Sequence, residues 1–136
     1  MPIINRIADY QEELTVWRRY LHQNPELGFE EFKTSDFVAN KLEDMGLSVH
    51  RGLAGTGVVA TLVSGDGTGG SIALRADMDA LPLQEKGSIA HRSETPGKMH
   101  ACGHDGHTTM LLGAAKYLSE TQNFNGTVQF VFQPAE

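Results

Sequence analysis

The sequence has little cysteine, no long hydrophobic run and few basic residues, and each scarcity excludes a class of protein. Its one cysteine, Cys102, cannot form a disulfide within the chain, which fits a reducing compartment. No apolar run is long enough to span a membrane, and the first residues lack the basic-then-apolar pattern of a signal peptide. The 11 Lys and Arg residues against 17 Asp and Glu give a net charge of −6, and they form no basic stripe. We therefore expect a cytoplasmic protein without nucleic-acid or membrane partners.

The rest of the composition is that of an ordinary globular domain. Hydrophobic residues make up 40% and charged residues 21% of the 136 positions. A chain of this length can bury roughly two thirds of the surface that its unfolded form exposes. We expect one domain, residues 1–136, with a substantial core.

The spacing of apolar residues predicts three helices. They recur every three or four positions from Ile3 to Leu21, which indicates one amphipathic helix that ends before Pro25. A second helix is predicted over 31–45, with Gly46 as its C-terminal cap. A third is predicted over 106–119, and its expected buried side consists of Leu111, Ala114, Ala115 and Leu118.

Strands are predicted between these helices, over 48–52, 57–63, 72–75 and 126–132. Interleaved helices and strands favour an α/β fold, a sheet with helices packed on it. The glycine-rich stretch 65–70 lacks the lysine and the following helix of a phosphate-binding loop, and it favours a hairpin turn. The stretch 77–105 has no predicted regular element, and so long an irregular segment in a compact domain is typical of a functional region.

The segment 100–107, HACGHDGH, concentrates groups that bind metals. It holds three of the six histidines, the only cysteine, an aspartate and two glycines that let the backbone bend. Thiolate, imidazole and carboxylate are all ligands of divalent metals. Cys102 and His104 are two residues apart, so both can reach one metal, or two adjacent metals bridged by the thiolate. Metal binding would require the deprotonated cysteine.

The predicted strands bring distant carboxylates toward this segment. Asp77 and Asp79 follow the end of one strand, and Glu136 follows the end of another. Open α/β sheets bind ligands at the carboxyl ends of their strands. We therefore expect the three segments to converge on one pocket.

These residue types suggest a hydrolytic site. Asp79, favoured over the turn-capping Asp77, can hold an imidazole in one tautomer. Glu136 is a candidate general base, because water beside a metal needs a carboxylate to take its proton as it attacks a carbonyl carbon. Other side chains are open between site and structural roles, namely His22, His100, Asp105 and His107. His50 and His91 are interpreted as surface residues.

The motifs resemble those of the M20 metallopeptidase and amidohydrolase family, in the branch of N-acyl-amino-acid amidohydrolases that includes hippurate hydrolases and auxin-conjugate hydrolases. The similar segments are RRYLHQNPEL at 18–27 with Glu30 and Thr34, LRADMDALP at 74–82, MHACGHDGH at 99–107 and FQPAE at 132–136. They occur in the order found in the family and extend over nearly the whole chain.

The resemblance implies a zinc-peptidase-like catalytic domain with two divalent metal ions, commonly manganese, zinc, nickel or cobalt. It assigns Cys102 as the bridging ligand, His104 as a histidine ligand, Asp79 as a residue that supports the site and Glu136 as the catalytic glutamate. The implied reaction converts an N-acyl amino acid and water into a carboxylate and an amino acid. Complete members of the family are often dimeric.

The sequence departs from the family pattern after Glu136. A second ligand glutamate, later ligand histidines and the smaller lid and dimerisation domain are all absent. The chain is therefore expected to be the N-terminal part of the catalytic domain, roughly the first third of an enzyme. We expect the isolated chain to be weakly stable or to associate with itself, because the strand ending at Phe132 would lack neighbours and expose an edge.

Two alternatives to a metal-dependent amidohydrolase remain. One is a metal-free thiol hydrolase with Cys102 as nucleophile and a nearby histidine as base, which a chelator would not inhibit. The other is a truncated, non-catalytic remnant that only binds metal or a partner.

Overall fold

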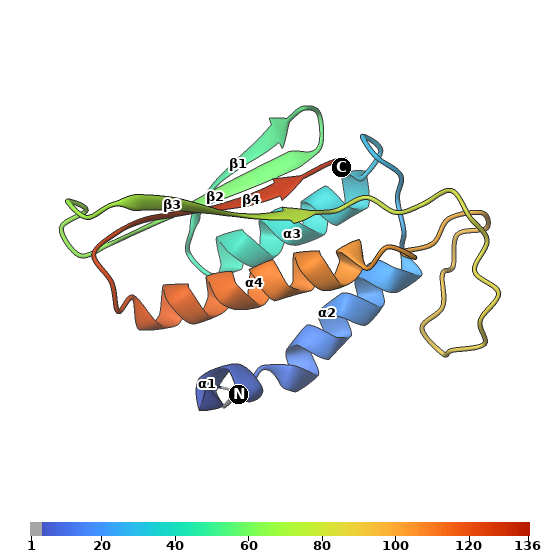
Figure 1. Cartoon of the computed structure of the whole chain (residues 1–136), viewed down its shortest axis with the longest axis horizontal. Helices are drawn as coiled ribbons and strands as arrows, with labels where there is room; N and C mark the ends of the chain where they lie inside the picture. Colours follow the sequence, from blue (N-terminus) through green and yellow to red (C-terminus); the bar gives the residue numbers. More distant parts are fainter. Residues whose placement is uncertain (1–3) are drawn as a thin grey trace.

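The computed structural model describes residues 4–136 and confirms the α/β fold, a sheet with helices packed on it (Figure 1). In chain order its elements are α1 (Asn5–Ala8), α2 (Gln11–Gln23), α3 (Phe32–Asp44), β1 (Ser48–Leu53), β2 (Gly57–Ser64), β3 (Ser71–Asp77), α4 (His104–Thr121) and β4 (Gly126–Gln133). Among these residues, none of the helices combines the length and the apolar character needed to cross a bilayer.

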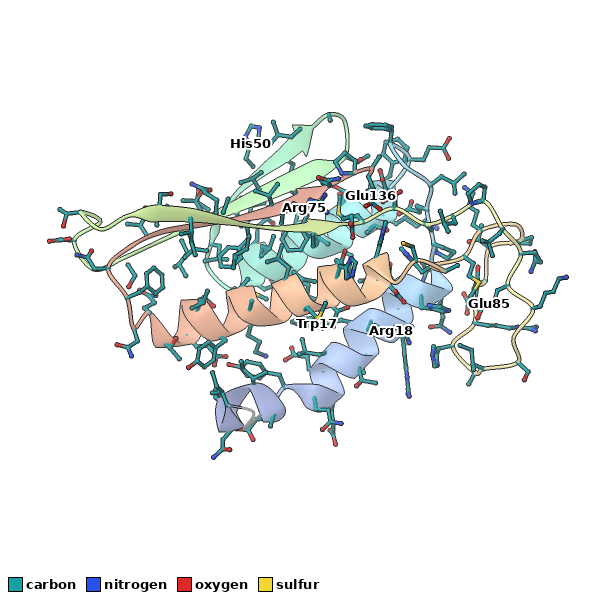
Figure 2. All side chains as sticks on the ribbon, in the orientation of Figure 1. Trp17, Arg18, His50, Arg75, Glu85 and Glu136 are labelled. Carbon is teal, nitrogen blue, oxygen red and sulfur yellow. The ribbon has the colours of Figure 1, made fainter. Side chains whose placement is uncertain are left out.

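The first predicted helix is broken into two. Helix α1 ends at Ala8, and α2 begins at Gln11 after a turn in which Tyr10 is buried. The predicted apolar face continues along α2, where Trp17 and Leu21 are buried (Figure 2). Ile3, the first residue of that predicted face, lies outside the described residues.

The sheet has the order β1-β2-β4-β3, which differs from a simple succession of hairpins. Strand β2 pairs antiparallel with both β1 and β4, and β3 pairs parallel with β4. The prediction of a hairpin turn at 65–70 is therefore wrong, because β4 lies between β2 and β3. The connection crosses the start of β4 so closely that a Cβ atom on Gly69 would collide with the carbonyl oxygen of Asn125. Glycine at this position is a requirement of close approach between two backbones.

The prediction that the strand ending at Phe132 lies at an exposed edge is also wrong. That strand is β4, which is paired on both sides. Phe130 and Phe132 are fully buried on its helix-facing side. Within residues 4–136 the sheet ends at β1 on one side and β3 on the other, so the pairing of β4 moves the open edge to β3.

The helices lie on one face of the sheet, and α4 is the central one (Figure 1). Helix α4 contacts β3, α3 and α2, which makes its buried side broader than predicted. Leu111 and Ala115 are buried as expected, and Leu112, absent from the prediction, is fully buried. Ala114 and Leu118 are only half-buried.

Candidate metal centre

Helix α4 begins at His104, two residues before the predicted start. Gly103 precedes it with a φ of 93°, a left-handed conformation that glycine adopts without strain. Cys102 therefore lies in the loop, whereas His104 occupies the first turn of the helix. The two side chains are held by different kinds of backbone, the one irregular and the other helical.

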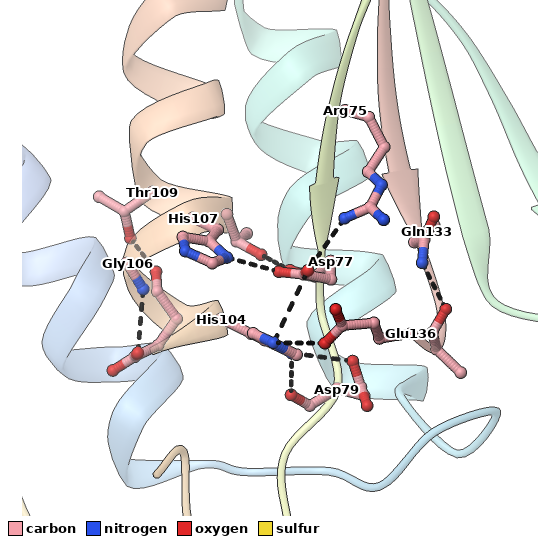
Figure 3. Close-up of polar contacts among 12 residues, drawn as sticks. Arg75, Asp77, Asp79, His104, Gly106, His107, Thr109, Gln133 and Glu136 are labelled. Carbon is pink, nitrogen blue, oxygen red and sulfur yellow. Dashed lines mark hydrogen bonds and ion pairs between the residues drawn. The ribbon is translucent and has the colours of Figure 1, made fainter. Parts of the chain in front are cut away.

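The imidazole of His104 is oriented by Asp79 (Figure 3). Its Nδ1 lies 2.9 Å from Asp79 Oδ1 and 3.0 Å from the backbone oxygen of the same residue. Because both are acceptors, Nδ1 carries the hydrogen, and Nε2 of the neutral ring keeps a free lone pair. Only 4% of the His104 side chain is exposed, so the ring is held on a single side of the helix.

Acidic and thiol groups converge on His104. Nε2 of its ring is 3.4 Å from Glu136 Oε2 and 3.6 Å from Asp77 Oδ2. One ligand atom from each of Cys102, His104 and Glu136 lies within 4.8 Å of the others. The amide of Met78 donates a hydrogen bond to the carbonyl of Gln133 at 3.1 Å, which continues the β3–β4 pairing beyond the end of β3. Asp77 and Glu136 lie at this end of the two strands. The four site residues predicted from the sequence are thus brought together at the carboxyl ends of two parallel strands.

A second group of ligand atoms shares His104 and consists of Asp77, His104 and His107, again within 4.8 Å of one another. His107 Nδ1 lies 2.7 Å from Asp77 Oδ1, and Arg75 Nη1 donates to Asp77 Oδ2 at 3.0 Å. Burial opposes ionisation of Asp77, but the hydrogen bond from His107, with a further one from the backbone, outweighs it and holds the pKa of this carboxyl below its usual value.

Sequence reasoning underrated Asp77 as a turn cap. Its carbonyl does accept a hydrogen bond from Thr108 at 2.8 Å, but its carboxylate faces the site. The spacing of His104 and His107, three residues apart, could have revealed this pairing. On a helix, residues at i and i+3 share one face, and a carboxylate that reaches one ring can reach the other.

The four side chains left open between site and structural roles lie in two places, inside the candidate metal centre and outside it. His107 lies in the site, half-exposed and stacked on the ring of His104 with centroids 5.5 Å apart. His22 and Asp105 are buried outside it, where they contact each other at 2.8 Å. His100 is buried, and neither of its ring nitrogens has a partner among residues 4–136. Burial lowers the pKa of His100 to about 4, against an opposing effect of the charge on Asp105.

The two histidines predicted to lie on the surface differ from each other. His50 is exposed on β1, as expected (Figure 2). His91 is half-buried and contacts Arg18 at 3.4 Å and the edge of the His22 ring. The prediction for His91 is therefore wrong in part, because the irregular segment folds back on α2.

The donor set fits a divalent first-row metal. A thiol, an imidazole with a free Nε2 and carboxylates are the ligands that such ions take in proteins. Two groups of potential ligands share His104, and this arrangement offers positions for adjacent ions. The carboxylate of Asp79, which contacts Nδ1 of His104, is a common kind of partner for a metal-binding histidine.

Comparison with known proteins gives consistent results. The model of "Peptidase family M20/M25/M40" matches residues 73–136. The chain is 52% identical over 136 residues to a hippurate hydrolase of Campylobacter jejuni, and this match covers 100% of the chain and 35% of that protein. It is 47% identical over 136 residues to an N-acyl-L-amino acid amidohydrolase of Geobacillus stearothermophilus, with 98% and 36% covered.

The fold is also found in solved structures. A dinuclear metal binding peptidase of the M20 family from Bacillus subtilis superposes with a TM-score of 0.89 and 40% identity, covering 95% of this chain and 36% of that one. The chain therefore spans about a third of the length of the curated relatives that it matches.

Proposed function

Because this chain belongs to peptidase family M20/M25/M40 and corresponds to an N-terminal portion of its members, we propose that it is the N-terminal part, residues 1–136, of the catalytic domain of a metal-dependent amidohydrolase. The observation that carries the proposal is the convergence of Cys102, His104 and Glu136 beside Asp79. The proposed reaction hydrolyses the amide bond of an N-acyl amino acid, in line with the names of the hippurate hydrolase and the amidohydrolase among its relatives.

In this proposal Cys102 and His104 hold the metal. Cys102 would supply its thiolate and His104 its Nε2. When bound, a divalent ion such as manganese, zinc, nickel or cobalt lowers the pKa of water and polarises the substrate carbonyl. Asp79 keeps the hydrogen of His104 on Nδ1, so that Nε2 remains a ligand atom.

Glu136 is the proposed general base. Its Oε2 faces His104, 3.4 Å from Nε2, so the carboxylate lies beside the candidate metal ligands. The carboxylate takes a proton from the water that attacks the acyl carbon, and it passes that proton to the nitrogen of the departing amino acid. Proton transfer through one carboxylate in both steps requires that the residue stay close to the scissile amide throughout.

The first test is metal content, measured by elemental mass spectrometry on the purified chain and on Cys102→Ala. His50→Ala is the matched control, because His50 is exposed on β1 away from the site. We expect bound metal in the wild type and the control, and its loss in Cys102→Ala. Equal metal in all three proteins would contradict the assignment of Cys102 and His104, whereas none in the wild type would show that further ligands are indispensable.

Hydrolysis of N-benzoylglycine by the protein that contains this chain is the second test. Activity that a chelator abolishes and added metal restores would support the amidohydrolase and exclude a metal-free thiol hydrolase. Glu136→Gln should retain metal while losing hydrolysis by about 100-fold or more. Metal binding by the wild type without turnover would favour the non-catalytic alternative.

A further inference from the structure

A buried ionic cluster lies on the other side of the first turn of α4 from the candidate metal centre. His22 of α2 is its middle member, with Nδ1 2.8 Å from Asp105 Oδ2 and Nε2 3.3 Å from Glu85 Oε1. The side chains of His22 and Glu85 are each 4% exposed, and that of Asp105 is 1% exposed. Arg18, one turn earlier on α2, adds a contact from its Nε to Asp105 Oδ2 at 3.0 Å. Both ring nitrogens of His22 therefore face carboxylates.

Asp105 connects this cluster to the metal centre through the backbone. It directly follows His104, and the two side chains point to different sides of the helix, because successive residues are about 100° apart around its axis. His104 is held by Asp79 after β3, whereas Asp105 is held by His22 and Arg18 on α2. Because adjacent residues of one helical turn are anchored on two sides, neither can rotate about the axis of α4 without breaking a buried contact.

Glu85 connects the cluster to the segment that leads into Cys102. The backbones of Leu81 and Met99 exchange two hydrogen bonds, of 2.9 and 3.0 Å, which close the irregular stretch between them into a loop. Glu85 lies inside that loop, and its Oε2 accepts a hydrogen bond from the amide of Ser93 at 2.6 Å. Figure 2 shows Arg18 on α2 and Glu85 on this loop. The chain leaves the loop at Met99 and reaches Cys102 three residues later.

We propose that His22 is a positioning residue that fixes the distance between the thiol of Cys102 and Nε2 of His104. The imidazole of His22 contacts Glu85 in the loop before Cys102 and Asp105 directly after His104. It therefore holds the segment that carries both candidate ligands at its two ends. This inference rests on the proposed function, because it assigns Cys102 and His104 as metal ligands. His22 touches neither side chain and acts only through Glu85 and Asp105.

The physical reason lies in the cost of moving buried charges. Without His22, Asp105 would keep only Arg18 and Glu85 only the amide of Ser93, and the loop and the helix would shift to satisfy the two buried carboxylates. A metal ion binds more tightly when its ligands are already held close to the bound geometry, because less ordering is needed on binding. Removal of a group that orients a metal ligand typically weakens metal binding by about 10–100-fold.

The test uses cobalt(II) titration of the chain, followed by the absorption band of a cobalt–thiolate bond. His22→Asn and His22→Gln form a graded pair. The amide nitrogen of asparagine takes the place of Nδ1 and keeps the contact to Asp105, whereas that of glutamine takes the place of Nε2 and keeps the contact to Glu85. His50→Asn is the control, because His50 is exposed on β1.

We expect His22→Gln to weaken cobalt binding by about 10-fold or more and to shift or diminish the thiolate band. His22→Asn should bind more tightly than His22→Gln, since Asp105 is adjacent to the ligand His104. Glu85→Gln, which is isosteric and leaves His22 in place, should weaken binding by a smaller factor. It also supplies the test if circular dichroism shows that the His22 variants are unfolded.

Unchanged affinity and an unchanged band in folded His22→Gln and Glu85→Gln would overturn the inference and leave the proposed metal ligands standing. Wild-type chain that binds cobalt without a thiolate band would instead overturn the ligand assignment and the inference with it. Equal weakening by the control would likewise count against a specific role for His22.

Discussion

Asp79 holds the imidazole of His104 through two acceptors, its carboxylate and its own backbone oxygen. Asp79→Asn keeps the shape and the backbone contact but removes the negative charge. We expect metal affinity to fall by about 10-fold, because a neutral acceptor makes the ring a poorer donor of its Nε2 lone pair. Competition with a coloured chelator measures the affinity. Asp44→Asn on the exposed end of α3 is the control, and an equal loss there would contradict the role of Asp79.

Glu31 is a buried carboxyl whose Oε2 accepts a hydrogen bond from Thr56 at 2.7 Å, while Oε1 has no partner in the part of the chain that the structure describes. Burial raises the pKa of Glu31, against the effect of the Thr56 hydrogen bond. The folded chain thus binds this proton more tightly than the unfolded chain. The stability contributed by Glu31 is present below its unfolded pKa and is lost as the pH rises through the higher folded pKa.

Glu31→Gln removes that titration. We expect the variant to gain stability relative to the wild type as the pH rises through the raised pKa of Glu31, measured by thermal unfolding over a range of pH. Glu30→Gln, next to it but exposed, removes only a surface ion pair with Lys98 and should show no comparable gain as the pH rises. A constant difference between Glu31→Gln and the wild type across this range would show that Glu31 is already ionised in the fold at the lower pH.

At the scale of elements, the start of α4 positions both candidate ligands, and two of its glycines provide a matched comparison. Gly103 has a φ of 93°, and Gly106 lies in the helix, while a Cβ atom on either would meet no atom within 4 Å. Gly103→Ala should lose roughly 1–2 kcal/mol of stability to backbone strain alone. Gly106→Ala should gain about 0.5–1 kcal/mol, because alanine favours a helix. Urea denaturation measures both, and changes of the same sign would contradict this geometry.

Helices and strands in which apolar residues recur at a regular spacing were predictable from the sequence. The order in which the strands pair was not. The alternation of apolar residues placed Phe130 and Phe132 on one face of β4, because local burial has a period of two in a strand. The order β1-β2-β4-β3 depends on contacts between residues far apart, for which a local pattern gives no signal. The start of α4 was misplaced because Gly103 provides no side-chain cap.

In the candidate site, too, some residues could be identified from the sequence and others only from the structure. Cys102, His104 and Glu136 were identified by ligand chemistry, which depends on residue type, and their convergence followed from the ends of the strands. Glu85 escaped notice because its partner His22 is 63 positions away. A single buried histidine is more often a packing residue, and only the structure shows that both of its nitrogens face carboxylates.

At the scale of the whole molecule, the outer edge of β3 is one of the two open edges of the sheet within the described residues. Within residues 4–136, β3 pairs on one side only, and Ile72 on it is 58% exposed. We expect the chain to self-associate at high concentration and Ile72→Lys to reduce this, as measured by sedimentation equilibrium. Val59→Lys is the control, because Val59 is half-buried on β2 and is paired there with both His50 of β1 and Val131 of β4. Equal effects of the two would indicate a general benefit of charge rather than blocking of an edge.

The place of β4 in the sheet also determines when the sheet can form on the ribosome. Strand β3 has no partner among the earlier strands, and its partner β4 is made only after the loop and α4. At about 5–20 residues per second, β3 waits roughly 2–10 s after its synthesis before β4 appears. During that interval the apolar residues of β2 and β3 are available to chaperones. A pause or a stop before Gly126 would leave β2 and β3 without the strand that pairs with both of them.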